Sequence, residues 1–527
     1  MSSQTAPTRG NALTLTFICS GIVLVYLDLT IVNVALPAMQ ASLSASVTQL
    51  QWIVDAYALV LACLLLSAGT LGDLFGRKRI FLGGLVGFIV ASVLCALAPT
   101  YETLLIARVI QGVAGSAMVP LSLALVSTIY TEPAARARAI GVWAGVGGLA
   151  LAAGPILGGV LVEGLGWQSI FWINVPVGLA ALIVLAIKLP TARPAVSRRM
   201  DLFGQVLFVV GIGALVYGLI QASALGWASP VIIGSIVGGV VILGLFVAWE
   251  RRFSDPMLPM SLMRNPVMVA AAAVNFFGLF GLFTTIFLLT LYLQRVNGLS
   301  TLAAGIRFLA LNIAIMVFSY LASVIANKLG ARVPIVVGSV MSAIGLLRLT
   351  MLEPGTTFLS YWWALALIGA GVSLVGAPAT VALLSSVRPE QAGTATGVSN
   401  TFRQVGSVFG VAIGGTLLVE HLHSTVPAAI ASLPLSGAQR ADMVQALSTG
   451  DLSAPDRLPA GLRDAVLHAV GPAVSGGVHL GLAVAAVGAL AGGIFALFAL
   501  RKPKTPATEP AEASAEREPA ATGNVRR

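Results

Sequence analysis

The chain has 527 residues, of which 57% are hydrophobic and only 9% are charged, and its mean hydropathy is +0.95. This composition excludes a soluble globular protein of the same length and indicates a polytopic membrane protein. The net charge of +10 does not indicate a nucleic-acid partner, because the basic residues fall in short segments between apolar runs.

Fourteen apolar runs are long enough to cross about 30 Å of hydrocarbon at about 1.5 Å per helical residue. The first run is too long for the hydrophobic region of a signal peptide and lacks a clean cleavage site, so we expect it to remain in the protein. The expected spans are residues 13–36, 49–70, 80–98, 103–127, 139–162, 170–189, 203–221, 230–249, 267–292, 303–326, 333–352, 358–384, 395–419 and 477–500.

The basic residues predict the orientation of these spans. With both termini in the cytoplasm, most of the 30 Lys and Arg residues fall on the cytoplasmic side. Those on the outer side are Arg295, Arg440, Arg457 and Arg463, and those within spans are Arg108, Arg307, Arg348 and Arg403. Because cytoplasmic loops carry an excess of Lys and Arg, we expect a multi-pass protein of the plasma (inner) membrane with both termini in the cytoplasm.

An internal repeat relates two parts of the chain that lie 256 residues apart. Each copy has a polar lead-in and then an apolar run whose glycines lie four residues apart, a pattern that allows close helix contact in lipid. The shared positions are Pro133, Ala139, Gly141, Val142, Gly154, Gly158, Gly159 and Leu161, which match Pro389, Ala395, Gly397, Val398, Gly410, Gly414, Gly415 and Leu417. Two such parallel halves are typical of alternating-access transporters.

If six helices form each half, spans seven and eight are an inserted pair. The tail is rich in Ala, Pro, Glu and Thr and is expected to be disordered. The expected organisation is a cytoplasmic segment (1–12), an N-terminal six-helix bundle (13–189), a cytoplasmic linker (190–202), the inserted pair (203–250), a second linker (251–266), a C-terminal six-helix bundle (267–500) with a long outer loop (420–476), and the cytoplasmic tail (501–527).

Two further features follow from the repeat and the outer loop. The segment 72–78, after the second span, is partly repeated in residues 326–332 after the tenth span. The acidic residue of the first segment, Asp73, is absent from the second copy. In the outer loop, His421-x-His423 could form half of a metal site. No acidic or cysteine partner has ligand spacing, so a solvated loop is favoured and no metal is expected.

Three stretches resemble motifs of the major facilitator superfamily. The loop after span two resembles that superfamily's signature between helices two and three, span five resembles its antiporter motif, and the end of span one resembles the fourteen-span drug:proton antiporter branch. The three stretches are Gly69-x-Leu71-Gly72-Asp73-x-x-Gly76-Arg77-Lys78, Gly145 with Gly154-Pro155-x-x-Gly158-Gly159, and Leu27-Asp28-x-Thr30-Ile31-Val32-Asn33-Val34-Ala35-Leu36-Pro37. The resemblance covers roughly residues 10–420.

The resemblance implies an all-α transmembrane fold of two pseudo-symmetric six-helix bundles plus two inserted central helices. It implies a secondary active exporter, functional as a monomer in the bilayer, that exchanges protons for lipophilic, often cationic drugs or antibiotics. The proton is the coupling ion and no cofactor is expected. The sequence has no Walker loop, metal-ligand set or nucleophile paired with a base, so we expect no enzymatic activity.

Asp28, Arg108 and Asp55 are the candidates for proton coupling. Counted along their spans, they lie ~13, ~8 and ~9 Å below the outer surface, so all three occupy the outer half of one bundle. A carboxylate in an apolar helix marks a functional site, and a nearby arginine allows Asp28 to switch between protonated and ionised forms. The alternatives are a static ion pair between Asp28 and Arg108, and, for Asp55, a cap of the second span.

Gly72 and Gly76 permit a tight reversal, while Asp73 with Arg77 and Lys78 forms a charge cluster. We expect this cluster to act as a conformational latch that biases the inward-closed and inward-open states; the alternative is that its basic residues only fix topology.

Pro155 is expected to kink span five, with glycines permitting the bend, whereas the second copy carries Val411 at this position. By resemblance, this asymmetry marks exchangers, and we expect it to help seal the outer path.

The predicted substrate cavity is apolar with few polar groups. Four phenylalanines on span nine form one helical stripe that could stack on a flat lipophilic compound, or that could be a lipid-facing or packing surface. The expected cavity residues are Asn33, Asn275, Phe276, Phe280, Phe283, Phe287 and Asn312.

Two other functions remain open from the sequence. One is a dedicated exporter of a single endogenous metabolite, such as an antibiotic made by its own host. The other is a membrane sensor or scaffold without transport, which would be expected to carry a sizeable soluble domain.

Overall fold

A computed structural model describes residues 9–189, 200–388 and 391–500 of the chain. Within these residues, 14 helices are long and apolar enough to cross a membrane, and their order agrees with the spans expected from hydropathy. The predicted all-helical, fourteen-span fold is confirmed. The expected segments 1–12, 190–202 and 501–527 fall wholly or largely outside the described residues.

The helices follow the expected grouping into six, two and six spans. The N half contains α1 (Arg9–Leu43), α2 (Val47–Phe75), α3 (Arg77–Ala96), α4 (Tyr101–Ile129), α5 (Pro133–Leu165), α6 (Ser169–Trp172) and α7 (Asn174–Lys188). The inserted pair is α8 (Leu202–Leu225) and α9 (Pro230–Glu250), followed by the 3-10 turn η1 (Leu262–Arg264). The C half contains α10 (Pro266–Leu291), the π-helical turn η2 (Tyr292–Val296), α11 (Thr301–Arg307), α12 (Leu309–Leu329), α13 (Arg332–Leu349), η3 (Phe358–Ser360), α14 (Trp362–Ser386), α15 (Ala392–Ala429), α16 (Gly437–Ser448), η5 (Ala454–Arg457) and α17 (Ala460–Ala499).

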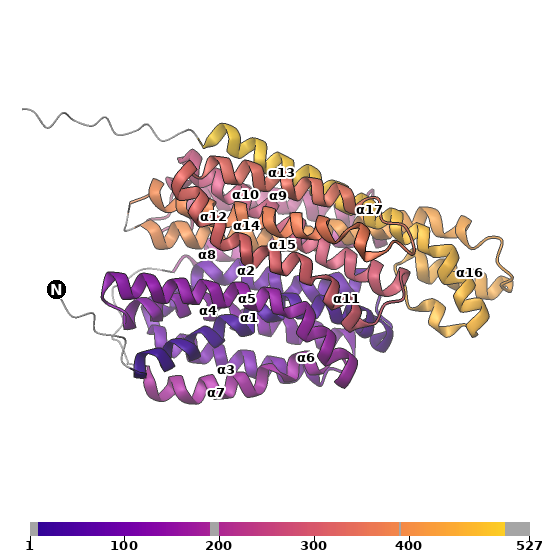
Figure 1. Ribbon diagram of the computed structural model, residues 1–527, viewed down its shortest axis with the longest axis horizontal. Coiled ribbons are helices and arrows are strands. Elements are labelled where there is room, and N and C mark those ends of the chain that lie inside the picture. Colours follow the sequence, from indigo (N-terminus) through magenta and orange to yellow (C-terminus); the bar gives the residue numbers. More distant parts are fainter. Residues whose placement is uncertain (1–8, 190–199, 389–390, 501–527) are drawn as a thin grey trace, which may run out of the picture.

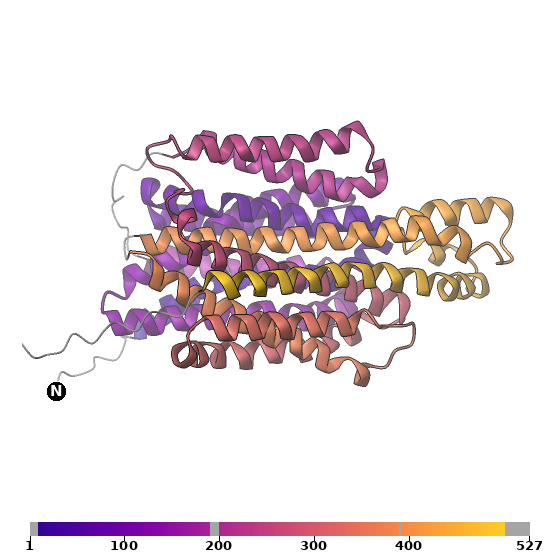
Figure 2. The same ribbon diagram turned by 90° about the horizontal axis from the view of Figure 1, so that it is seen from above.

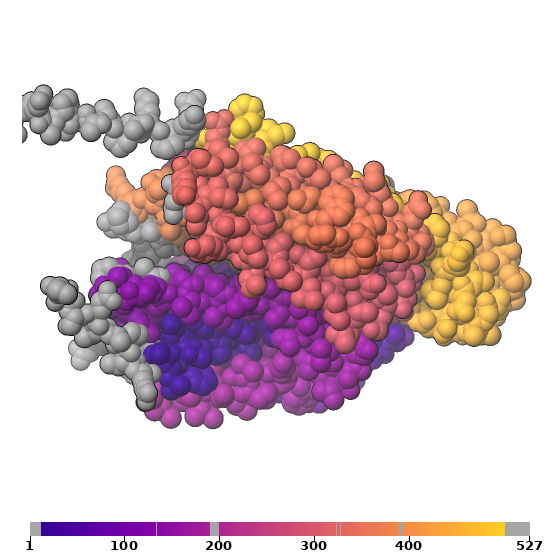
Figure 3. All heavy atoms as spheres, in the orientation of Figure 1, coloured from indigo at the N-terminus to yellow at the C-terminus, as the bar shows by residue number. Residues whose placement is uncertain are grey.

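The two halves lie side by side as two elongated layers (Figure 1). The start of α1 and the end of α17 lie at one end of the molecule, which we call the termini end. The segment with α16 projects beyond both layers at the opposite end, which we call the α16 end, and the space-filling view shows it as a separate knob (Figure 3).

Polar residues set the ends of the long apolar helices. Ser46 and Thr100 form capping boxes at the starts of α2 and α4. Glu132 caps α5, and the backbone N–H groups of Ala134 and Ala135 hold the pKa of its carboxyl below the ordinary value. These caps explain why the helices begin where they do, because they satisfy backbone donors that have no partner inside the helix.

The inserted pair lies at one edge of the molecule, as the view from above shows (Figure 2). The α8 helix contacts both halves: Gln205 donates from Nε2 to the carbonyl of Cys63 on α2 at 2.9 Å, and Thr416 on α15 donates to the carbonyl of Leu219 at 2.8 Å. The α9 helix packs on α8 and exposes most of its side chains, as expected for a lipid-facing helix.

The connection 420–476 is helical, and the expectation of a solvated loop is wrong. The α15 helix continues to Ala429, α16 follows, and α17 begins at Ala460. Leu422, Val426 and Ile430 recur every four residues and are fully buried, so they extend the bundle core beyond the span. The polar composition of the segment hid this apolar face. No group of three or more metal-ligating side chains occurs in the described residues.

Candidate functional site

Asp28 and Arg108 form an ion pair inside the N half. Arg108 Nη1 contacts Asp28 Oδ2, and both side chains are buried, with residue exposures of 1% each. They reach each other from α1 and α4, so the common depth predicted from the sequence places them correctly. A pair this deeply buried is strongly coupled, because removing one partner leaves the other charge uncompensated.

Three further polar side chains complete this cluster. Gln111, one turn after Arg108, accepts from Arg108 Nη1 at 2.8 Å and donates to Asp28 Oδ1 at 3.1 Å. Gln111 also donates to Ser92 Oγ on α3 at 3.0 Å, and Asn174 at the start of α7 donates to the same oxygen at 3.2 Å. Four transmembrane helices of the N half therefore meet at one hydrogen-bonded network.

Helix α2 supplies the remaining partners of Arg108. The guanidinium donates from Nε to the carbonyl of Ile53 at 3.0 Å and lies 4.3 Å from the centroid of the Tyr57 ring. The ring of Phe171 on α6 lies 5.8 Å away on another side. The Asp28 carboxylate, the Ile53 carbonyl, the Gln111 amide and the two aromatic rings together compensate the charge of Arg108, which allows it to remain in an apolar bundle.

Asp55 does not join this cluster, because it lies on a different face of α2. Ile53 and Tyr57 face Arg108, whereas Gln51 and Asp55 are offset by two residues, or about 200° around the helix. Gln51 faces α15, since its Nε2 donates to the carbonyls of Val411 and Ala412 at 3.1 and 2.8 Å. Asp55 is fully buried, and neither of its carboxylate oxygens has a hydrogen-bond partner.

The register of α2 against α15 places Asp55 at the contact between the halves. The two helices are antiparallel: Gln51 contacts Gly415, and Leu66 lies against Gly397. By this register, Asp55 lies opposite the turn of α15 near Gly410. Ser46 caps α2 nine residues earlier, so the alternative role of Asp55 as a helix cap is excluded.

The loop 72–78 has the charge cluster expected from the sequence. Arg77 Nε donates to Asp73 Oδ1 at 3.0 Å, and both side chains are partly exposed. Lys78 donates from Nζ to the carbonyls of Ala186 and Leu189 at 2.8 and 2.6 Å, which caps the last turn of α7.

The two glycines of this loop have separate roles. Gly76 has a φ of 96°, a conformation that requires glycine between α2 and α3. Gly72 instead lies against Leu121 of α4, where a Cβ would clash.

The glycine face of α5 makes close contacts on two sides. Gly154 and Gly158 pack against Thr30 and Ile31 of α1, while Gly159 packs against the backbone of Leu302 in the C half. No atom lies within 4 Å of a Cβ placed on Gly145, so the structure does not bring that residue into a packing contact. The small-residue pattern therefore predicted the contact face of α5 correctly from Gly154 onward.

Pro155 lies inside α5 and frees a backbone carbonyl that other helices use. Because proline lacks an N–H, the carbonyl of Leu151 has no helical donor at position 155, and Thr30 Oγ1 donates to it at 3.1 Å. Asn312 on α12 donates from Nδ2 to the neighbouring carbonyl of Ala152 at 2.6 Å. The two carbonyls in the turn before Pro155 thus accept bonds from both halves, one from α1 and one from α12.

Polar contacts between the halves concentrate toward the α16 end. Backbone carbonyls of one half accept from side chains of the other, and Glu163 accepts from the backbone N–H of Leu302 at 3.1 Å. The other contacts in this group are Gln294 to Val34, Arg295 to Pro37, Gln40 to Gly450, Asn312 to Ala152, and Gln51 to Val411 and Ala412. Together with the contact of Gly305 with the Pro155 carbonyl, these bonds close the molecule at that end.

The predicted phenylalanine stripe is mainly a packing surface. Phe280, Phe283 and Phe287 are buried, and the Phe276 ring is half-buried beside that of Phe409, with ring centroids 5.9 Å apart. The backbones of Phe276 and Phe280 lie against Gly406 and Gly410 of α15. The lipid-facing alternative is excluded, because the stripe points into the C half.

The three asparagines assigned to the cavity have different surroundings. Asn33 is fully buried and donates to the carbonyl of Leu29 at 3.0 Å, while its Oδ1 has no partner. Asn275 donates to Ser399 Oγ at 3.1 Å between α10 and α15. Asn312 belongs to the closed contact with α5 and does not line an open cavity in this conformation.

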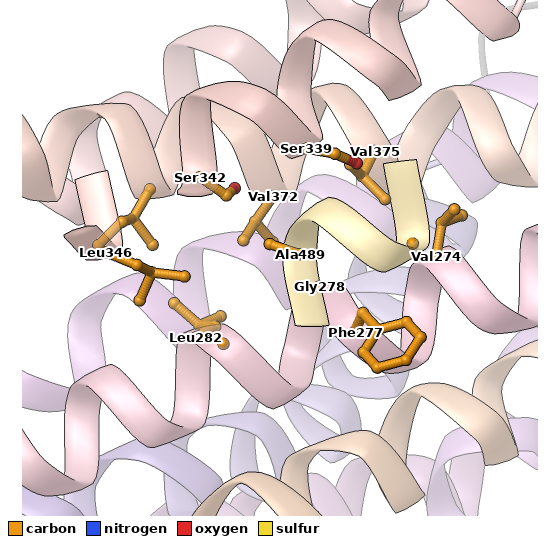
Figure 4. Close-up of a pocket in the computed structure, with 13 residues that line it drawn as sticks. Val274, Phe277, Gly278, Leu282, Ser339, Ser342, Leu346, Val372, Val375 and Ala489 are labelled. Atoms are coloured by element: carbon orange, nitrogen blue, oxygen red, sulfur yellow. The ribbon is translucent and has the colours of Figure 1, made fainter. Parts of the chain in front are cut away.

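A small apolar cavity lies within the C half, on the face of α10 opposite the stripe (Figure 4). Phe277 and Leu282 of α10, Ser339 and Ser342 of α13, and Val372 of α14 line it. Its free volume is only about 10 Å³, no more than about one water-sized sphere. It is a packing void, too small for a drug-sized compound.

Several members of the site lack a clear sequence signal. The position of Gln111, one turn after Arg108, indicates that it belongs to the site. Ser92, inside α3, and Asn174, at the start of α7, carry no such signal. Arg403 also escaped assignment: its Nη2 donates to the Tyr26 hydroxyl at 3.3 Å, which joins α15 to α1. Such contacts depend on how the helices face each other.

Comparisons with known proteins agree with this architecture. Residues 18–411 match the family model described as Major Facilitator Superfamily. The multidrug resistance protein Stp of Mycobacterium tuberculosis (strain ATCC 25618 / H37Rv) is 38% identical over 421 residues, which are 79% of this chain and 78% of the relative. The tetracenomycin C resistance and export protein of Streptomyces glaucescens is 34% identical over 494 residues, which are 92% of this chain and 91% of the relative.

A solved structure shares the fold. A bacterial homolog of the human lysosomal transporter Spinster, crystallised in an inward-facing and unoccupied conformation, aligns with a TM-score of 0.64 at 18% sequence identity. The alignment covers 94% of this chain and 100% of that chain.

Proposed function

The chain belongs to the major facilitator superfamily, and on this premise we propose that it is a secondary active exporter of drugs or antibiotics driven by proton exchange. Its substrates are lipophilic, often cationic small molecules. The observation that carries the proposal is the buried Asp28–Arg108 pair in a chain whose relatives are named for multidrug resistance and antibiotic export.

The pair supplies a site that can hold or release one proton. Protonation of Asp28 removes one of two opposite buried charges and leaves Arg108 supported by Gln111, the Ile53 carbonyl and two aromatic rings. This loss is worth several kcal/mol in an apolar interior, enough to change the packing of α1 against α4. Since α1 also carries Thr30 and Ile31, the change reaches the glycine face of α5.

Asp55 is proposed as a second proton site, at the contact between α2 and α15. A fully buried carboxylate without a donor is stable only when protonated or when the contact opens. Separation of α2 from α15 would expose it, and α8 covers the same contact. Its protonation is therefore linked to the movement of one half against the other.

The α16 end is proposed to face the outside, and the termini end the cytoplasm, in agreement with the excess of basic residues at the termini end. On this orientation the polar contacts between α5 and α11, and between α2 and α15, close the outer path, with Pro155 at their centre. The Asp73–Arg77 cluster lies at the cytoplasmic face, where we propose that it acts as the conformational latch.

Substrate is proposed to bind between the halves, below this outer closure. Asn33 supplies a buried oxygen without a donor, and Asn275 lies near the same interface. The phenylalanine stripe positions α10 against α15 and contributes to the cavity wall only through the half-buried Phe276.

Dye efflux in everted membrane vesicles tests the proposal. An imposed pH gradient is expected to drive dye transport by the wild-type protein, whereas Asp28→Asn is expected to reduce it to the level of vesicles without the protein. Asp464→Asn, which alters an exposed acid at the α16 end, is the matched control and is expected to transport normally.

The same experiment separates coupling from a static ion pair. A static pair predicts that folded Asp28→Asn protein, purified and reconstituted, still responds to the pH gradient. A gradient response in that variant would refute the coupling role, even if its thermal stability were reduced.

A dedicated exporter of one metabolite is the second candidate. The relative from Streptomyces glaucescens, named as a tetracenomycin C resistance and export protein, favours it because the match spans 92% of this chain. Transport of many unrelated dyes would support the multidrug function, and transport of a single compound from a panel that includes tetracenomycin C would support the dedicated one.

A further inference from the structure

The second copy of the loop motif, residues 326–332, differs from the first in both charge and packing. In the first copy, Asp73 pairs with Arg77, and Lys78 caps the last turn of α7. In the second copy the acid is replaced by Asn327. Gly330, with a φ of 76°, keeps the same turn geometry as Gly76, so Arg332 takes the place of Lys78 at the start of α13.

Arg332 has no protein partner among the described residues. The residue is half-buried at the start of α13, and its guanidinium makes no side-chain hydrogen bond or ion pair with another described residue. In the N half, Lys78 bonds the last carbonyls of α7. At the corresponding place in the C half, a hollow of about 660 Å³ lies beside the end of α17. This volume is within the range of about 300–1,000 Å³ typical of small-molecule sites.

The walls of the hollow are mostly apolar. Its lining includes Leu329, Val333, Val337, Val381 and Leu497, each of which is exposed in spite of its apolar side chain. Among the described residues that line it, Arg332 is the one that carries a charge. An apolar hollow with a single unpaired cation at its rim fits a ligand that has an acyl chain and an anionic head group.

Further basic residues surround the rim. Lys328 is exposed in the last turn of α12. Arg264 precedes Asn265, whose side-chain amide donates to the carbonyl and hydroxyl of Ser386 in the hollow wall at 3.0 and 3.2 Å. Arg388 is exposed and lies two residues after Ser386 in the chain. Basic pockets between transmembrane helices bind anionic lipid head groups in this way.

We propose that this hollow binds an anionic phospholipid, with an acyl chain along α13 and α14 and its phosphate on Arg332. The lipid supplies the counter-charge that the second copy of the motif has lost. The proposal concerns a surface of the C half outside the Asp28–Arg108 cluster, and its outcome is independent of the transported substrate.

Native mass spectrometry of the purified full-length protein tests the site, with phosphatidylglycerol and phosphatidylcholine of the same chain length as probes. We expect tighter binding of phosphatidylglycerol, and a loss of about fivefold in Arg332→Ala, the effect of about 1 kcal/mol for one basic residue. Arg252→Ala removes an exposed charge between α9 and η1 and is the matched control, with no loss expected. Equal binding of the two lipids, or an unchanged affinity in Arg332→Ala, would overturn the proposal.

Two further measurements complete the test. One does not depend on the folding of Arg332→Ala, and the other asks whether something else occupies the hollow. A photoactivatable phosphatidylglycerol on the wild-type protein is expected to label segments 331–337 and 381–386, and labelling elsewhere would contradict the site. Truncation after Leu500 is expected to leave lipid binding unchanged. Binding that appears only after truncation would show that residues 501–527 occupy the hollow in the intact chain, and would refute the lipid assignment.

Discussion

The two copies of the repeat use the same positions with different chemistry. Gly154 and Gly158 of α5 pack on α1, and Gly410 and Gly414 of α15 pack on α10, so each copy holds the first helix of its own half. Each copy also contacts the second span of the opposite half. There, α5 presents the Pro155 carbonyl to the backbone of Gly305, whereas α15 presents the Val411 carbonyl to the side chain of Gln51.

The two halves also differ in buried charge. The described spans of the N half bury Asp28, Asp55 and Arg108, while those of the C half bury no carboxylate among their described residues. Closely similar helix packing thus supports chemistry in one half and a neutral framework in the other. The difference shows that one repeat can be folded around buried charges while its counterpart has no buried carboxylate among its described spans.

Removal of the buried charge is expected to have the largest effect. Arg108→Ala leaves Asp28 buried without its cation and should lower the free energy of unfolding by about 3–5 kcal/mol. Arg403→Ala, in the C half, removes only a part-buried contact with Tyr26 and serves as the comparison. Thermal denaturation of the purified variants measures both effects, and equal losses would contradict the contrast between the halves.

Exchanging the residues Pro155 and Val411 tests the difference in backbone hydrogen bonding between α5 and α15. Val411→Pro removes an N–H from α15 and frees the carbonyl of Ser407, whereas Thr284, the counterpart of Thr30 on α10, donates to the carbonyl of Gly410. The change should therefore cost about 3 kcal/mol. Pro155→Val should change stability by less than about 1 kcal/mol and slow transport, because α5 loses its kink. Denaturation midpoints and vesicle efflux rates give the two readouts. Normal transport by Pro155→Val would show that the kink has no role in exchange.

Cβ atoms added to the glycine face should have intermediate effects. Gly154→Ala places a methyl group against Thr30 and only 2.9 Å from the backbone nitrogen of Ile31, and we expect a loss of about 1–3 kcal/mol. Gly145→Ala is the matched control, since that position has no neighbour within 4 Å. The melting temperatures of the two variants should therefore differ, and similar values would indicate that α5 packs differently on α1.

The exposed latch should contribute least to stability. Asp73→Asn removes one partly exposed ion pair, worth about 0–1 kcal/mol. It should nevertheless shift the balance of conformations, measured as cross-linking between cysteines introduced at the termini end of the two halves. Asn327→Asp is the reciprocal change, and unaltered cross-linking in both variants would leave the motif with a purely topogenic role.

The sequence predicts the parts of this molecule that depend on periodicity and depth. Hydropathy identifies every described span, and the count of residues from the membrane surface brings Asp28 and Arg108 to one level. The same count places Asp55 at that level but cannot show that it faces α15, because the direction of a side chain depends on helix rotation. Whether the phenylalanine stripe and Asn312 pack against helices or line a cavity depends on rotation in the same way, and the polar composition of 420–476 concealed its buried apolar positions.

The length of α17 has a mechanical consequence. With 40 residues, it is ~60 Å long, about twice the thickness of the hydrocarbon layer. If the helix tilts as one unit by about 10°, with Pro472 in its interior, its far tip moves by ~10 Å relative to its base. The segment with α16 should therefore move farther than the base of the helix when the C half tilts. Spectroscopic labels attached to this segment would report that tilt as a measurable displacement.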